Sequence, residues 1–148
     1  TGNGQFTPQG TTTRGMLAAV LYRMAGSPKA PKGTFADVES SMYYADAVAW
    51  AAENGIVTGL DATTYAPAHS ITREQLAAML YRYAGEPDAS ADLSAYTDAG
   101  EILSYAQKAM QWCVANGILN GKTGSALAPQ ATATRAECAA MLQRLAQL

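Results

Sequence analysis

An internal repeat constrains this chain more than any other feature of its sequence. A Thr-Arg pair occurs three times, with its arginine at Arg14, Arg73 and Arg135, so the period is 59 and then 62 residues. Each pair follows a short segment that contains a proline, and each opens a stretch with helical spacing of apolar residues. A period of this length is typical of a chain that uses one supersecondary unit several times.

A second block precedes only the last two Thr-Arg pairs. It runs from Phe35-Ala36-Asp37 to Asn54-Gly55-Ile56 and again from Tyr96-Thr97-Asp98 to Asn116-Gly117-Ile118. We therefore expect residues 1–26 to be the second half of one repeat. Residues 27–86 and 87–148 are expected to be two whole repeats, and the three parts together are expected to form one structural unit.

Each whole repeat is expected to hold two helices joined by a loop. The first helix of the middle repeat has an apolar face with i, i+4, i+7, i+8 spacing, made by Tyr43, Ala47, Trp50 and Ala51. Asn54-Gly55 then ends that helix, because glycine readily takes the left-handed conformation after a helix C-terminus. The sequence shows no long alternating strand pattern.

The second helix of each repeat has a sequence signal for its start. Thr72 and Gln75 are spaced as a capping box, and Thr134 and Glu137 repeat the pattern, whereas Met16 breaks it in the first copy. These patterns predict a mainly α fold, a pseudo-threefold bundle of helix-loop-helix repeats with long loops.

Composition excludes several classes of function. The chain has 10 Lys+Arg against 12 Asp+Glu and a net charge of −2, so it lacks the basic excess of a nucleic-acid binder or a polybasic membrane anchor. No apolar run approaches the roughly 20 residues that span a bilayer, so we expect no membrane insertion. The sequence opens without Met or a secretory signal pattern, and we expect it to be an excised or processed piece of a longer protein.

Few residues are suited to metal binding or catalysis. A zinc site needs three or four converging ligands, and the chain has two cysteines and one histidine, His69, which we expect to lie on the solvated surface. We expect no cofactor and no enzyme activity, since helix capping or a solvated surface explains the candidate acids Glu53, Glu74, Glu101 and Glu137. Cys113 and Cys138 fall on core-facing helix positions, as free thiols or as a disulfide, and the free state is favoured.

The first arginine of each repeat admits two interpretations. Arg14, Arg73 and Arg135 follow the capping threonine, at the helix end where a cation is slightly unfavourable. In one interpretation the guanidinium binds carbonyls of the adjacent loop, such as that after Pro67. In the other, the guanidinium and the free N–H groups of the helix form a two-part site for a carboxylate or phosphate. The sequence leaves both open.

The aromatic and acidic residues near these helix starts also have two explanations. Trp50 and Trp112 have the spacing of a helix–helix core, and this is favoured over a groove that stacks on sugar rings. Asp37 and Asp98 are explained either as caps of a helix or turn or as acceptors for sugar hydroxyls.

The order of these elements resembles a known repeat family. Aromatic-x-Asp, an aromatic helix, Gly-Ile-x-x-Gly, aromatic-x-Pro and Thr-Arg together are similar to the S-layer homology (SLH) repeat. The best matches are Phe35-Ala36-Asp37, Gly55-Ile56-Val57-Thr58-Gly59, Tyr65-Ala66-Pro67 and Ile71-Thr72-Arg73-Glu74. The resemblance covers essentially the whole chain.

The resemblance implies a function outside the cell. Such units are non-covalent anchors that hold proteins to secondary cell-wall polysaccharide, an anionic polymer that often carries pyruvylated sugars, on Gram-positive-type envelopes. Location at the cell surface and binding to cell-wall polysaccharide are thus implied. The implied ligand-binding residues are the motif arginines, acids, first aromatics and loop glycines: Arg73, Arg14, Arg135, Asp37, Asp98, Tyr43, Tyr105, Gly59 and Gly121.

The sequence also departs from the family pattern. Tyr43 and Tyr105 stand where tryptophan is usual, and Leu127 replaces the aromatic residue before Pro129. We therefore rank Arg73 first, Arg14 second and Arg135 last as ligand contacts. The alternative function is a protein–protein interaction or assembly module whose glycan grooves have decayed. A solvent-facing Arg73 beside Asp37 or Tyr43 would favour the first function, and an Arg73 buried among loop carbonyls the second.

The incomplete first repeat predicts a further property. An apolar stripe of Leu17, Val20, Leu21 and Met24 has no partner helix from its own repeat. We expect either self-association through this stripe or a rearranged N-terminus.

Overall fold

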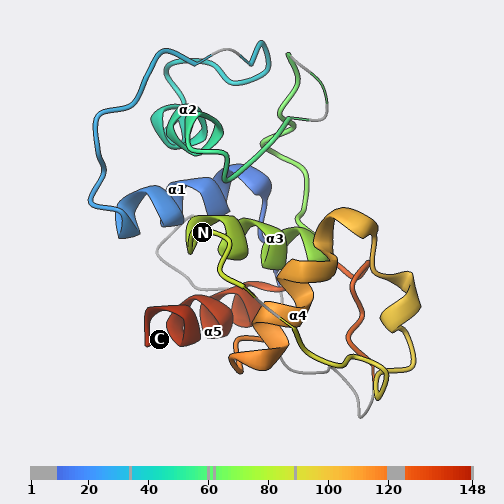
Figure 1. The fold of residues 1–148 in the computed structure, drawn as a ribbon. Coiled ribbons are helices and arrows are strands. Elements are labelled where there is room, and N and C mark those ends of the chain that lie inside the picture. The colour runs from blue at the N-terminus through green and yellow to red at the C-terminus, as the bar shows by residue number, and fades with distance from the viewer. Residues whose placement is uncertain are drawn as a thin grey trace. The chain divides into compact units, whose positions relative to one another are not determined.

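The structure of the chain is a computed structural model, which describes residues 10–33, 35–59, 61, 63–88, 90–119 and 126–147. These residues form α1 (Arg14–Met24), α2 (Ala45–Glu53), α3 (Arg73–Tyr83), α4 (Gln107–Ala115) and α5 (Arg135–Ala146), with short 3-10 helices η2 (Ala99–Glu101) and η3 (Ser104–Ala106) (Figure 1). Extended pairing among them is confined to three isolated β-bridges. The predicted mainly α fold class is confirmed.

The chain divides into two compact units. The small unit is Thr13–Ser70 and contains α1 and α2, which pack together. The large unit combines Thr1–Thr12 with Ile71–Leu148, and in it α3 packs against α4 and against α5. Each of the pairs α1–α2 and α3–α4 joins the second helix of one predicted repeat to the first helix of the next, so the pairs cross the predicted repeat boundaries.

This pairing corrects the expectation for the incomplete first repeat. Leu17 and Leu21 are fully buried, and Val20 is half-buried, because α2 supplies the partner that α1 was expected to lack. Met24, at the helix end, remains 39% exposed. The expectation of an uncovered stripe was therefore wrong for its central residues, and the structure offers no support for self-association there.

The helix boundaries follow the predicted signals. Thr72 and Thr134 both form complete capping boxes, whereas Thr13 caps α1 through the N–H of Met16 alone. Asn54 ends α2, and Gly55 follows in the left-handed region with φ 70°. The side-chain amide of Asn54 donates to the carbonyl of Trp50 at 2.8 Å, and Asn116 does the same to Trp112 at the end of α4.

Tryptophans hold the helix pairs together. Trp50 contacts Tyr22 at 5.5 Å between ring centroids in the small unit, and Trp112 contacts Tyr81 at 5.7 Å in the large unit. Both tryptophans are buried, which confirms the core interpretation. The expected core position of Tyr43 was wrong, because α2 begins two residues later and the Tyr43 side chain is 64% exposed.

The remaining sequence expectations concern the thiols, the histidine and the membrane. Cys113 and Cys138 are both free and buried, as favoured from the sequence. Burial raises the pKa of the Cys113 thiol to about 12. His69 is exposed. None of the described helices has the length and apolar character to cross a bilayer.

Candidate functional site

The N–H groups at the three helix starts already have partners. The backbone N–H of each motif arginine donates to a loop carbonyl: Arg14 to His69 at 2.9 Å, Arg73 to Ala131 at 2.9 Å and Arg135 to Gly10 at 2.8 Å. The next N–H groups of α1 and α3 donate to Pro67 and Pro129, and the capping threonine accepts the third. At α1 and α3 the predicted two-part anion site therefore lacks its free N–H groups.

The Arg14 side chain is buried in the small unit and donates hydrogen bonds to the adjacent loop. Its Nε donates to the carbonyl of Tyr65 at 2.9 Å, and one Nη donates to the carbonyl of Thr58 at 2.8 Å. The guanidinium also lies 4.5 Å from the centroid of the Tyr65 ring, a cation–π contact. Burial raises the pKa of Tyr65 to about 12, although the charge of Arg14 acts in the opposite direction.

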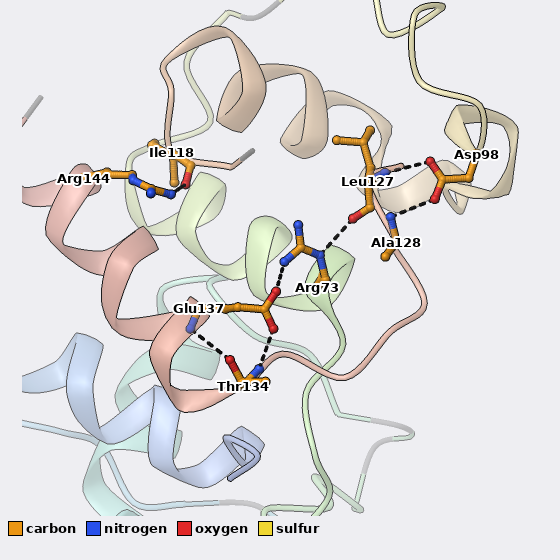
Figure 2. A network of polar contacts seen from close by, with 8 residues as sticks. All are labelled: Arg73, Asp98, Ile118, Leu127, Ala128, Thr134, Glu137 and Arg144. Carbon is orange, nitrogen blue, oxygen red and sulfur yellow. Dashed lines mark hydrogen bonds and ion pairs between the residues drawn. The ribbon is translucent and has the colours of Figure 1, made fainter. Parts of the chain in front are cut away.

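Arg73 repeats this arrangement in the large unit. Its side chain is buried, its Nε donates to the carbonyl of Leu127 at 2.8 Å, and its guanidinium pairs with Glu137 of α5 (Figure 2). Glu137 also accepts the N–H of Thr134 at 3.0 Å in the capping box of α5. One carboxylate therefore links the starts of two helices.

Arg135 has a more open setting than the other two arginines. It is half-buried, and its Nε donates to the carbonyl of Thr11 at 3.3 Å. The structural interpretation, in which the guanidinium binds loop carbonyls, thus holds for all three arginines, most strongly for Arg14 and Arg73.

Asp37 and Asp98 each hold a turn about 30 residues further along the chain. The two carboxylate oxygens of Asp98 accept the N–H groups of Leu127 and Ala128, both at 2.8 Å (Figure 2). Asp37 accepts those of Tyr65 and Ala66 at 2.9 and 2.8 Å. These acids are therefore turn caps.

The environment of these acids favours their charged forms. Burial raises the pKa of each carboxyl, but hydrogen bonds from backbone N–H groups, above all the two in the turn, outweigh it and leave the pKa below the ordinary value of 3.8. Arg73 lowers the pKa of Asp98 further. Both acids are thus ionised near neutral pH.

The structure brings the predicted arginines and acids together around one residue in each unit. In the small unit, Arg14 binds the carbonyl of Tyr65 while Asp37 binds its N–H. In the large unit, Arg73 and Asp98 hold Leu127 in the same way. The spacing of the Asp, the aromatic-x-Pro segment and the Thr-Arg pair therefore has a direct structural cause.

Gly59 is required by the packing of its own loop. A Cβ at this position would lie 2.4 Å from Cε1 of Phe35, 2.5 Å from the carbonyl oxygen of Asp61 and 2.6 Å from that of Thr64. The space that we expected a ligand to approach is thus filled by the protein itself. Its counterpart Gly121 lies outside the described residues.

The predicted tyrosines differ in their surroundings. Tyr43 contacts only Tyr44 among the aromatic rings described, edge to face at 5.0 Å. Tyr44, which no sequence motif singles out, lies against the start of α1, where a Cβ on Gly15 would be 3.0 Å from its Cδ2. Tyr105 is 47% exposed, and its hydroxyl donates to Glu74 at 3.4 Å.

Glu74 is the residue that sequence reasoning missed. We expected capping or a solvated surface to explain it, but it is 1% exposed, because three groups surround its carboxylate. It accepts the N–H of Leu103 at 3.1 Å, the hydroxyl of Tyr105 at 3.4 Å and the side-chain amide of Gln130 at 2.9 Å. The signal was present in the repeat, since the positions equivalent to Glu74 hold Gly15 and Ala136.

The site has no feature of metal chemistry in the part of the chain that is described. No group of three His, Cys, Asp or Glu residues there could hold a metal ion. Every buried side-chain nitrogen or oxygen in the same residues has a hydrogen-bond partner. What the described residues offer a ligand is the exposed rings of Tyr43 and Tyr105 and the half-buried side chain of Arg135.

Comparison with known proteins gives one matching family and several relatives. The S-layer homology domain model matches residues 34–77 and 95–139, more than half of the chain. The Surface-layer 125 kDa protein of Lysinibacillus sphaericus is 34% identical over 96% of this chain. The Amylopullulanase of Thermoanaerobacterium thermosulfurigenes is 32% identical over 95% of it, and the Cellulosome-anchoring protein of Acetivibrio thermocellus is 29% identical over 95%.

These relatives are much longer than the chain. The matched region is 12% of the surface-layer protein, 8% of the amylopullulanase and 33% of the cellulosome-anchoring protein. The similarity to the amylopullulanase thus involves a small fraction of its length.

Proposed function

Because the chain belongs to the S-layer homology domain family, we propose that it is a non-catalytic anchoring module of the bacterial cell surface. In this proposal it binds an anionic secondary cell-wall polysaccharide of a Gram-positive-type envelope and holds a longer protein there. Pyruvylated sugars are the proposed source of the negative charge.

One observation carries the proposal. The same segment, over at least 95% of this chain, occurs in a surface-layer protein, a cellulosome-anchoring protein and an amylopullulanase. Proteins with such different names share a module rather than a reaction. A common need to stay at the cell surface accounts for the shared segment, whereas a common catalytic activity does not.

The geometry supports some of the proposed ligand residues better than others. The exposed rings of Tyr43 and Tyr105 are open to a sugar, and Arg135 can meet a carboxylate at the loss of a single long hydrogen bond. Arg14 and Arg73 must give up loop carbonyls to do so. We therefore place Arg135 ahead of Arg73 and Arg14, whereas the sequence ranked it last.

A second function is favoured by the burial of Arg73. A buried Arg73 held by a loop carbonyl and by Glu137 is the arrangement expected of a module that binds protein instead of glycan. The exposed rings of Tyr43 and Tyr105 favour the glycan, because an exposed aromatic ring can stack on a sugar ring. Direct binding separates the two functions.

The test is co-sedimentation with purified cell-wall sacculi. Sacculi with their secondary polymer and sacculi stripped of it are compared, using the full chain and the variants Arg135→Ala and Tyr43→Ala. We expect binding to be lost on stripping and weakened by each substitution. Asp46→Ala, which removes an exposed acid outside the motif, serves as the control, and thermal unfolding checks that each variant is folded.

Two results would overturn the proposal. Equal binding to intact and stripped sacculi would show that the polymer is not the ligand. An absence of binding to intact sacculi, together with capture of a purified surface-layer protein, would establish the protein-interaction function.

A further inference from the structure

Two Asn-Gly pairs lie where the first helix of each whole repeat ends. Asn54-Gly55 follows α2 in the small unit, and Asn116-Gly117 follows α4 in the large unit. An Asn-Gly pair is prone to spontaneous deamidation, because glycine has no side chain to hinder the reaction. The glycine nitrogen attacks the side-chain carbonyl carbon of asparagine and expels ammonia, and water then opens the succinimide ring to aspartate or isoaspartate. Both asparagines are exposed, so water has access to them.

The backbone at the end of α2 holds the glycine nitrogen away from the asparagine side chain. Ring closure requires the nitrogen of Gly55 to be eclipsed with Cβ of Asn54 about the Cα–C bond. With ψ 9°, it is instead nearly eclipsed with the backbone nitrogen of Asn54. The N–H of Gly55 is also engaged, because it donates to the carbonyl of Ala52 at 3.2 Å.

Further hydrogen bonds fix this geometry. The side-chain amide of Asn54, which is the leaving group, donates to the carbonyl of Trp50 at 2.8 Å. The N–H of Ile56 donates to the carbonyl of Ala51 at 2.8 Å, and this bond and that of Gly55 together form a Schellman motif. Attack on the side chain therefore requires the helix end to open first.

The end of α4 is built in the same way. Asn116 has ψ 7°, and its side-chain amide donates to the carbonyl of Trp112 at 2.9 Å. The N–H of Gly117 donates to the carbonyl of Val114 at 3.1 Å. Each compact unit thus carries one such pair, and a difference between their reaction rates would report how often each helix end opens.

We propose that Asn54 and Asn116 are modification sites controlled by local unfolding: each deamidates when its helix end opens, and the product then prevents that end from closing. Aspartate places a carboxylate beside a backbone carbonyl, at the helix end where negative charge is unfavourable. Isoaspartate adds the Cβ atom to the main chain, so the two bonds of the Schellman motif no longer fit. Because ammonia is lost, the modification accumulates with each opening.

The test follows deamidation of the full chain by mass spectrometry at pH 8, in buffer and in urea. Tandem mass spectrometry assigns each site and separates Asn116 from Asn120, whose pair with Gly121 lies outside the described residues. Synthetic peptides of residues 51–58 and 113–119 provide the rates without the folded structure.

A substitution tests the effect of the product. Asn54→Asp reproduces one product in the small unit, and urea unfolding followed by circular dichroism compares its stability with that of the unchanged chain. Glu53→Gln, at the neighbouring exposed position, is the matched control for a change of one charge.

We expect both asparagines to react in urea at the rates of the matching peptides. In buffer they should react at least about tenfold more slowly, because only the open fraction of the chain reacts. Asn54→Asp should lower the urea midpoint, since the helix end loses the donor to Trp50 and gains a negative charge. Glu53→Gln should not lower it.

Three results would overturn the proposal. Equal rates in buffer and in urea would show that the folded helix ends do not control the reaction. Asparagines that stay intact in urea while the peptides react would show that these are not modification sites. An Asn54→Asp chain as stable as the unchanged chain would show that the product does not keep the helix end open.

Discussion

Asp98 holds Ala128 in a left-handed backbone conformation. The carboxylate accepts the N–H of Ala128 at 2.8 Å, and Ala128 has φ 52°. Asp37 holds Ala66, with φ 62°, in the same way. A left-handed alanine costs about 1–2 kcal/mol, so the acid stabilises a turn that the alanine alone would not adopt.

The substitution Asp98→Ala should lower the free energy of unfolding by about 1–3 kcal/mol, because it leaves two backbone N–H groups without their charged acceptor. Urea unfolding followed by circular dichroism measures the change. Asp88→Ala, at an exposed acid, should stay within about 0.5 kcal/mol. An Asp98→Ala chain as stable as the control would mean that the turn does not need its cap.

The same acids predict an acid-sensitive stability. The pKa of Asp37 and of Asp98 lies below 3.8 in the folded chain, so both add stability above that pH. This stability is lost as the pH falls from about 3.8 through the folded pKa values. We expect the melting temperature to drop over that range, and to drop less in Asp98→Asn. If the melting temperature of Asp98→Asn falls with pH as much as that of the unchanged chain, other carboxylates are responsible for the fall.

Local features of the fold could be predicted from the sequence because they depend on neighbouring residues. The Thr72–Gln75 box and the Asn54-Gly55 helix end involve residues at most three apart, and both form as expected. The pairing of α1 with α2 could not be predicted in the same way. A repeat in the sequence defines a period, but it leaves open which helix of the next copy covers each apolar face.

The candidate site was harder to predict, for a reason that Arg73 illustrates. A guanidinium at a helix start is equally suited to a ligand carboxylate and to the Glu137 carboxylate of the same chain, and only the tertiary structure decides. Glu74 shows the reverse case. A glutamate is usually found on the solvated surface, so the sequence predicted an exposed Glu74. Its burial depends on Leu103, Tyr105 and Gln130, which lie 29 to 56 residues away along the chain.

The pair of Arg73 and Glu137 should make a large contribution to stability. Arg73→Ala removes the ion-pair partner of the Glu137 carboxylate and leaves an empty space next to it. We expect it to lower the free energy of unfolding by about 3–5 kcal/mol. Arg135→Ala, at a half-buried arginine with one long hydrogen bond, should cost about 1 kcal/mol or less. Urea unfolding of both variants gives the comparison.

A double-mutant cycle with Glu137→Gln tests whether the pair itself is responsible. The two substitutions together should cost less than the sum of their separate effects, because each removes the same ion pair. Strict additivity would instead assign the effect of Arg73→Ala to its bond with Leu127.

Gly59→Ala should destabilise the small unit by about 1–3 kcal/mol, since its Cβ would overlap Phe35 and two carbonyl oxygens. Gly33→Ala is the matched control, because its nearest neighbour is 3.9 Å from the added Cβ. Urea unfolding should separate the two. Equal stability would mean that the loop moves aside at no cost, and that Gly59 remains open to the ligand role implied by the family.

The two thiols should be inert in the folded chain. Burial raises the pKa of Cys113 to about 12 and that of Cys138 to about 11, against an ordinary 9.0, although a hydrogen bond with Thr12 acts the other way at Cys138. Only the thiolate reacts with a disulfide reagent, so at pH 8 the native chain should react slowly and at a rate set by unfolding. Adding urea should release two rapidly reacting thiols. Fast reaction of either thiol without denaturant would contradict the buried placement, and Cys113→Ala would show which thiol is responsible.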